Sequence, residues 1–180
     1  MMNLKTKDLT VIGLYAALIV LGIMFFRIPM GSQFVHMGNA LIAVGILVFG
    51  AKRGAIAASI GLAIFDITHG YASVAWVTVL ESLIVAFVLY LVFEKAMKKH
   101  DTPFNIIICA IVAAVTKIIV NLIKYTFFRN MLVGGLAFKP AFLAALVKIG
   151  GTFGSAAVTI IAVPLLYPIL KKIVIRYYER

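Results

Sequence analysis

A stripe of polar residues interrupts one of the most apolar stretches of this 180-residue chain. Lys117, Asn121, Lys124 and Phe128 follow one another at i, i+4, i+7 and i+11, a spacing that places them on one face of a helix. Two lysines and an amide on one face can bind a polar ring or an anion through charge and hydrogen bonds. If this helix lies in a membrane, the stripe must face other polar groups or a wet cavity, because a charge at the bilayer centre costs at least about 2.5 to 3.5 kcal/mol.

Ten polar or aromatic residues are candidates for one substrate-binding site. They are His36, Asn39, Asp66, Tyr71, Trp76, Glu81, Lys117, Asn121, Lys124 and Lys148. The apolar segments described below bring all of them toward the same side of a membrane. Two acids and three bases at similar depth favour a polar pocket open to that side, and aromatic rings at its rim suit a flat heterocycle.

Purely structural roles for these residues stay open. Glu81 and Asp66 can form ion pairs with the three lysines that only join helices, although a buried ion pair is weak evidence for stability. Trp76 is equally typical of the aromatic belt at a membrane surface. The two loop histidines, His36 and His69, have no matching Cys or Glu constellation, so we expect no metal site.

The composition places these residues in a membrane. Of the 180 residues, 64% are hydrophobic and 13% are charged, and the mean hydropathy is +1.13, a combination foreign to soluble domains. A spanning helix needs about 20 apolar residues, so a chain of this length allows about six spans. Gly, Pro and charged residues separate the helices 9–26, 37–50, 54–69, 76–93, 104–128 and 141–170. We expect an all-α membrane protein in which residues 1–180 form one compact bundle of six transmembrane helices.

The 17 Lys and Arg residues are divided unequally between the two sides of this bundle. Eleven fall on the side of both termini, three on the opposite side and three within helices. Excess basic residues mark the cytoplasmic side, so we expect both termini in the cytoplasm. The net charge of +11 then forms juxtamembrane collars that meet anionic lipid headgroups, and nucleic acid is not expected as a partner.

No catalytic motif accompanies the polar residues. The chain lacks His-Glu-x-x-His, Gly-x-Ser-x-Gly and a Walker loop, so we expect neither an enzyme nor a cofactor. Energy for any transport must then come from a partner or from an ion gradient. A stand-alone proton-coupled carrier is the alternative function, because Asp66 and Glu81 could titrate within the membrane.

Three patches of small residues allow helices to approach closely. They are Gly13 with Ala17, the stretch GAIAASIG at 54–61 and the stretch IGGTFGSAA at 149–157. Packing inside the bundle and docking of a partner are both compatible with each patch.

Two stretches carry a resemblance to a known family. The tight basic turn FGAKRG (49–54) and the segment GLAIFDITHGYASVAWVTVLE (61–81), in a chain of six short spans, resemble the substrate-binding S components of energy-coupling factor (ECF) vitamin transporters. The likeness covers nearly the whole chain. It is closest from Gly38 to Glu81, where it is similar to the branch handling hydroxymethylpyrimidine-like and pyridoxine-like vitamins and riboflavin relatives.

The resemblance implies a function and a set of partners. It implies capture of a small vitamin at the outer face of a bacterial cell membrane and its import with a transmembrane coupling subunit and two cytoplasmic ATPases. The family docks on the coupling subunit through an Ala-x-x-x-Ala in the first helix, to which Gly13 with Ala17 is the nearest match, and residues 27–35 correspond to the family's lid. Lys117, Asn121 and Glu81 are expected to contact the ligand directly or through one partner residue. The motifs are specific for the family and leave the vitamin open.

Overall fold

A computed structural model gives the fold, and it describes residues 6–31 and 33–179. Lys5 and Arg180, two of the basic residues expected at the cytoplasmic side, lie outside the described residues. The elements in chain order are α1 (Thr6–Phe25), β1 (Arg27–Met30), β2 (Gln33–His36), α2 (Gly38–Phe49), α3 (Ala51–Thr68), η1 (Ala72–Val74), α4 (Ala75–Leu89), η2 (Tyr90–Ala96), α5 (Pro103–Ile123), η3 (Lys124–Val133), α6 (Phe138–Lys148) and α7 (Gly150–Glu179). The short η1 is a 3-10 helix, whereas η2 and η3 are π-helical continuations of α4 and α5.

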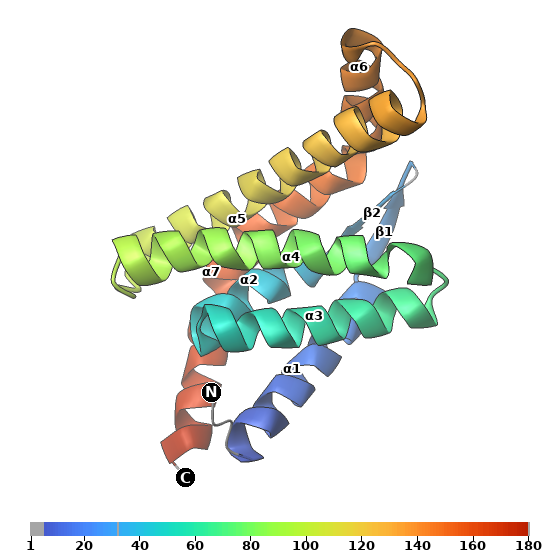
Figure 1. The fold of residues 1–180 in the computed structure, drawn as a ribbon. Coiled ribbons are helices and arrows are strands. Elements are labelled where there is room, and N and C mark those ends of the chain that lie inside the picture. The colour runs from blue at the N-terminus through green and yellow to red at the C-terminus, as the bar shows by residue number, and fades with distance from the viewer. Residues whose placement is uncertain (1–5, 32, 180) are drawn as a thin grey trace.

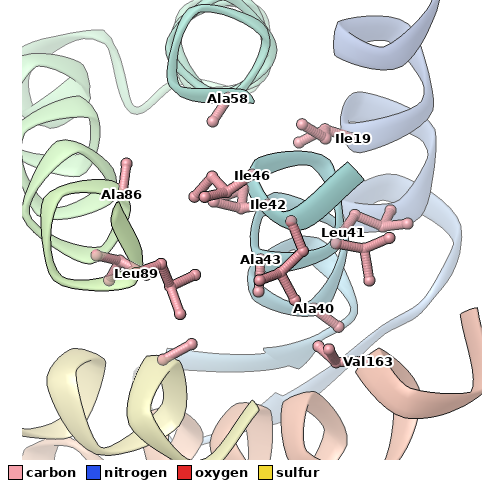
Figure 2. Close-up of a cluster of buried hydrophobic side chains, with 14 of the residues drawn as sticks. Ile19, Ala40, Leu41, Ile42, Ala43, Ile46, Ala58, Ala86, Leu89 and Val163 are labelled. Atoms are coloured by element: carbon pink, nitrogen blue, oxygen red, sulfur yellow. The ribbon is translucent and has the colours of Figure 1, made fainter. Parts of the chain in front are cut away.

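Helix α2 forms the centre of the core. Nine of its 12 residues are buried, and Figure 2 shows other helices on its sides, with Leu41 near Ile19 of α1 and Val163 of α7 beneath. A helix that is apolar all round is stable only where neighbours cover it. With 12 residues it is about 18 Å long, too short to cross about 30 Å of hydrocarbon.

A single glycine joins α2 to α3. Gly50 has φ +84°, a conformation that glycine adopts without steric cost, and this allows α3 to begin at the next residue. The turn is therefore as tight as FGAKRG predicts. A Cβ on Gly54 would collide with the backbone of Ile46, and one on Gly61 would collide with the carbonyl oxygen of Ala16. The small-residue patch at 54–61 thus serves close packing inside the bundle.

Four helical stretches of the described chain are long and apolar enough to cross a membrane. They are Thr6–Phe25, Ala72–Ala96, Pro103–Val133 and Gly150–Glu179. Large apolar side chains such as Leu14, Phe87 and Leu165 are exposed on their outer faces, as expected of surfaces that contact lipid. The fold is that of an all-α membrane protein with one small β-hairpin added.

The helix expected over 141–170 differs from the observed structure. It is two helices, because α6 ends at Lys148 and α7 begins at Gly150, next to two glycines of low helix propensity. Helix α7 continues through Pro164 and Pro168 to Glu179, well beyond the predicted end. The fifth helix is also longer, since its π-helical part extends to Val133.

The segment after α1, expected to be a loop, forms an antiparallel β-hairpin. Arg27 pairs with His36 and Pro29 with Phe34, around a turn in which Gly31 has φ +60°. Gly151 and Gly154 of α7 leave room for the hairpin, because a Cβ on either would overlap Gln33 or Val35. The small-residue patch at 149–157 therefore packs against this hairpin.

The start of α1 and the end of α7 lie at the same end of the bundle (Figure 1). Asp8 of α1 accepts hydrogen bonds from Arg53 of α3 at 3.1 Å and from Tyr178 of α7 at 2.7 Å. The amide of Ala51 donates to Glu94 of η2 at 2.6 Å. These bonds hold the helix ends together on the side to which the sequence assigns most of the basic residues.

Candidate functional site

Glu81 is the centre of a buried polar cluster between α4 and α5. Its side chain is only 7% exposed and accepts hydrogen bonds from the Nζ of Lys117 at 2.6 Å and from the Nζ of Lys124 at 2.5 Å. The amide of Asn121 donates to the carbonyl of Lys117 at 3.1 Å and approaches Glu81 Oε2 at 3.4 Å. Three members of the polar stripe, two from α5 and Lys124 from the start of η3, thus converge on one carboxylate of α4.

The fourth member of the stripe does not join them. From Lys124 onward the helix has π geometry, whose wider turns change which residues share a face. Phe128 is 60% exposed as a result. Short π-helical segments occur frequently at functional sites, and this one begins at a lysine of the cluster.

A small cavity lies beside the cluster. Its volume is about 10 Å³, room for about one water molecule. The residues that line it are Asn39, Ile42, Ser82, Val85, Ala113, Ala114, Lys117, Ala156 and Thr159. Asn39 and Lys117 were expected from the sequence, whereas the hydroxyl residues Ser82 and Thr159 were missed. Ser82 directly follows Glu81, which was a usable signal, but nothing local marks Thr159.

Asp66 brings a second carboxylate to the same region. It is 6% exposed, and its Oδ2 has no hydrogen-bond partner among the described residues. Lys117 and Glu81 are both close enough to act on it electrostatically. A buried acceptor without a donor costs free energy, of the order of 1 to 3 kcal/mol. Asp66 is not among the residues that line the cavity, so its contact with a ligand stays a prediction.

Lys148 reaches the cluster only indirectly. Its side chain lies at the exposed end of α6, and its Nζ is 6.0 Å from the centre of the Tyr125 ring. The Nζ of Lys124 lies 4.6 Å from the same ring centre. Tyr125, which sequence reasoning did not select, thus stands between the two lysines and contacts both through cation–π interactions.

The expected aromatic rim lies outside the cavity lining. Trp76 is 69% exposed, as in a membrane-surface belt, and Tyr71 stacks with Phe65 at 6.5 Å between ring centres. His69 also stacks on Phe65, at 4.3 Å. The Nδ1 of His36 accepts from the amide of Gly38 at 3.1 Å, which places this ring at the start of α2. A ligand role for these rings stays a prediction.

The β-hairpin is fastened to α7 next to the cavity. Gln33 Oε1 accepts from the amide and the hydroxyl of Thr152 at 3.0 and 3.1 Å. The hydroxyl of Ser155 donates to the carbonyl of Phe34 at 3.3 Å and accepts from the amide of His36 at 3.1 Å. The segment that the sequence assigns to a lid is therefore an ordered hairpin held by side chains one turn from the cavity-lining Thr159.

The polar cluster offers binding groups and no metal-binding constellation. No group of three His, Cys, Asp or Glu side chains in residues 6–31 and 33–179 could hold a metal ion. Lys117 and Lys124 both form ion pairs with Glu81, so the site combines ammonium and amide donors with carboxylate acceptors. Such a site suits a polar molecule with several hydrogen-bonding groups.

One small-residue patch is not covered by any other part of the chain that the structure describes. Gly13 and Ala17 lie on an exposed face of α1, and a Cβ on Gly13 would meet nothing within 4 Å. Gly54 and Gly61, by contrast, pack against other helices. Of the three patches noted in the sequence, the one on α1 is open to another protein.

Comparison with known proteins places the chain in a family. No curated protein and no solved structure matches it. The family model described as "ECF-type riboflavin transporter, S component" matches residues 3–172, which is nearly the whole chain and includes every residue of the polar cluster. The chain therefore belongs to the ECF-type riboflavin transporter S component family, and it is a membrane-embedded, substrate-specific subunit for vitamin uptake by an ECF transporter.

Proposed function

We propose that this S component captures a small water-soluble vitamin or vitamin precursor of the hydroxymethylpyrimidine or pyridoxine type. It takes the ligand at the outer face and passes it inward in complex with a coupling subunit and two ATPases, and it catalyses no reaction itself. The observation that carries the proposal is the buried cluster of Glu81, Lys117, Lys124 and Asn121 beside a cavity. Burying charged groups in a membrane bundle costs free energy. Binding of a polar ligand gives these groups a function that accounts for this cost.

The hydrogen-bonding groups suit a substituted nitrogen ring. In the cavity lining, Lys117 supplies donors and Ser82 and Thr159 supply hydroxyls. Outside the lining, the buried Asn121 adds an amide and Asp66 adds an oxygen without a hydrogen-bond partner among the described residues. Hydroxymethylpyrimidine and pyridoxine both combine ring nitrogens with hydroxymethyl groups, so each offers donors and acceptors around a flat ring. A ligand hydroxyl or amino group that donates to Asp66 would remove the unsatisfied buried oxygen.

The small size of the cavity favours a vitamin with a single ring over a flavin with three fused rings. At about 10 Å³ it must widen before any vitamin enters, since small-molecule sites usually enclose about 300 Å³ or more. Ala113, Ala114 and Ala156 line it with short side chains, and a single ring requires less displacement than a tricyclic flavin. Riboflavin is the second candidate, because the description of the matching family names it.

The first experiment identifies the ligand. Native mass spectrometry of the protein purified in mild detergent, without added ligand, reports any small molecule that accompanies it. Equilibrium titrations with hydroxymethylpyrimidine, pyridoxine and riboflavin then rank the three, with biotin as an unrelated vitamin. Tight binding of a single-ring compound supports the proposal. Preference for riboflavin would replace the proposed substrate, and failure to bind any of them would overturn the assignment of the pocket.

A matched pair of variants tests the site. Asn121→Ala removes the amide of the cluster, and Asn105→Ala removes the other asparagine of α5, whose amide donates to the carbonyl of His100 at the opposite end. We expect the first to weaken vitamin binding about tenfold or more, in line with the loss of one or two buried hydrogen bonds, and the second to leave it unchanged. Unchanged binding by folded Asn121→Ala and Glu81→Ala proteins contradicts a ligand site at this cluster.

The exposed patch on α1 is the proposed contact with the coupling subunit. Gly13→Leu adds a bulky side chain at a position where no described residue lies within 4 Å of an added Cβ, so the isolated subunit should stay folded and bind vitamin normally. Co-purification with the coupling subunit and the ATPases should fall strongly. Ala157→Leu, on an exposed face of α7, is the control.

Vitamin uptake that needs no ATPase and collapses with a protonophore would support the proton-coupled carrier instead.

A further inference from the structure

A second and much larger hollow lies at the end of the bundle that holds the termini. It is a groove of about 510 Å³ between the start of α5 and the last turns of α7. Its lining consists of Asp101, Pro103, Ile106, Ile107, Pro164, Tyr167, Pro168, Lys171, Lys172, Ile175, Arg176 and Glu179. Figure 1 shows the cause, because the final part of α7 diverges from α5 and runs toward the chain ends.

The floor and one wall of the groove are apolar. Ile107 and Ile175 expose 41% and 44% of their surface, and Pro164 and Pro168 add rigid apolar surface without backbone donors. Exposed apolar side chains of this kind are stable in a groove that contains hydrocarbon. The wall belongs to α5 and α7, and both helices lie in stretches long and apolar enough to cross the membrane.

In the described part of the chain, the rim of the groove carries three basic side chains, of which one is in an ion pair and two are not. Lys171 forms an ion pair with Asp101, which also accepts a hydrogen bond from Tyr167 at 3.0 Å. Lys172 and Arg176 have no ion-pair partner among the described residues. They are four residues apart and therefore on one face of α7. The rim also includes the acidic Glu179, so the free positive charge is confined to that one face.

We propose that this groove binds one anionic phospholipid from the leaflet on the side of the termini. The lipid phosphate lies against Lys172 and Arg176, and an acyl chain follows the wall formed by Ile107, Pro164 and Ile175. Basic pockets between transmembrane helices at the cytoplasmic side are typical sites for anionic lipid headgroups. A lipid at the membrane boundary can contact both the apolar wall and the cationic rim. A soluble anion would contact only the rim. This site is separate from the vitamin cluster and does not depend on which vitamin is bound.

Native mass spectrometry with added phosphatidylglycerol tests the proposal on the full-length protein. The variant Lys172→Gln/Arg176→Gln removes the two free cations of the groove. The control Lys52→Gln/Lys98→Gln removes two exposed lysines from the same end of the bundle, neither of which has an ion-pair partner within residues 6–31 and 33–179. We expect the groove variant to bind the first phosphatidylglycerol about tenfold or more weakly, given the usual contribution of each basic residue near an anionic lipid. The control should retain the affinity of the unmodified protein. Equal losses in both variants would show diffuse attraction only and overturn the site.

Two further measurements separate the lipid from other occupants. Ile107→Trp fills the apolar wall without changing charge and should also weaken phosphatidylglycerol binding, whereas glycerol 3-phosphate at millimolar concentration should not displace the lipid. Displacement by glycerol 3-phosphate would assign the rim to a soluble anion. Unaltered lipid binding by the groove variant, together with loss of its co-purification with the coupling subunit, would assign the groove to protein docking.

A gain of binding provides the test in the opposite direction. Asp101→Asn removes one negative charge and releases Lys171 from its ion pair, so the groove then presents three free cations. Phosphatidylglycerol should bind several-fold more tightly, while phosphatidylcholine binding should change little. A decrease or no change in phosphatidylglycerol affinity would contradict the placement of the phosphate at this rim.

Discussion

Two carboxylates of this protein meet lysines in opposite surroundings. Glu81 is 7% exposed and receives two lysines, beside a cavity of about 10 Å³. The side chain of Asp101 is 33% exposed and receives Lys171, beside a groove of about 510 Å³. In the first region the carboxylate is enclosed and forms ion pairs with two lysines. The second region is open, and Lys172 and Arg176 at its rim have no ion-pair partner among the described residues.

The difference follows from the cost of removing charge from water. An ion inside an apolar bundle loses its hydration, so each charge must find partners in the protein. A charge at the membrane boundary keeps water and counterions, and an unpaired lysine is tolerated there. This contrast is the basis of both proposals, a polar ligand at the interior cluster and an anionic lipid at the groove.

The largest expected effect comes from neutralising the interior carboxylate. Glu81→Gln leaves Lys117 and Lys124 without their counter-charge in a buried site. The free energy of unfolding should fall by about 3 to 5 kcal/mol, the usual result of removing one partner of a buried pair. Thermal unfolding in detergent measures the change. If the melting temperature of Glu81→Gln equals that of the unmodified protein within error, the charge of Glu81 does not stabilise the fold.

Removing one of the two interior lysines should have a smaller effect. In Lys124→Met, Glu81 keeps Lys117 and Asn121, and the lysine that is lost is 28% exposed. We expect a loss of about 1 to 2 kcal/mol in the free energy of unfolding, typical of a partly buried substitution. The same unfolding assay applies. If Lys124→Met is as damaging as Glu81→Gln, the carboxylate depends on both lysines together.

Salt distinguishes the two regions without mutation. Raising the ionic strength from about 0.1 to 1 M shortens the screening length from about 10 to about 3 Å. Phosphatidylglycerol binding at the open groove should weaken several-fold, whereas vitamin affinity at the closed cluster should change less than twofold. Titrations at the two salt concentrations provide the measurement. Equal salt dependence would contradict the contrast between closed and open sites.

The smallest expected effect comes from the boundary carboxylate. Asp101→Asn should lower the free energy of unfolding by less than about 1 kcal/mol at neutral pH, because the pair with Lys171 is partly solvated. The hydrogen bond from Lys171 lowers the pKa of Asp101 below its ordinary value of 3.8. The stabilisation is therefore present above about pH 3.8 and disappears as the pH falls through the lowered pKa of the folded state.

Melting temperatures of the two proteins at pH 7 and in stronger acid, below pH 3.8, measure this contribution. The difference between unmodified protein and Asp101→Asn should shrink in acid. A difference that grows in acid would mean that the pKa of Asp101 is raised in the folded protein.

Patterns local to the chain predicted several features of the fold and site. Hydropathy predicted a helical membrane protein, the spacing of Lys117, Asn121 and Lys124 predicted a shared face, and FGAKRG predicted a tight turn. The hairpin over 27–36 was missed, because its strands pair with each other and with α7. The break at Ile149 was missed for a related reason, since apolar composition continues across it and the packing of the hairpin against Gly151 and Gly154 is not visible in local sequence.

The sequence by itself determined that the chain lies in a membrane, which residues are polar within it, and which family motifs it carries, because these depend on composition and on spacing within single helices. Only the tertiary structure decided that Lys117 and Lys124 share Glu81, which lies 36 residues before the first of them, and that Thr159 faces the same cavity. It also decided that the end of α7 diverges from α5 to leave a groove. Such pairings depend on the positions of helices distant in the chain, which hydrophobic packing sets without any local mark in the sequence.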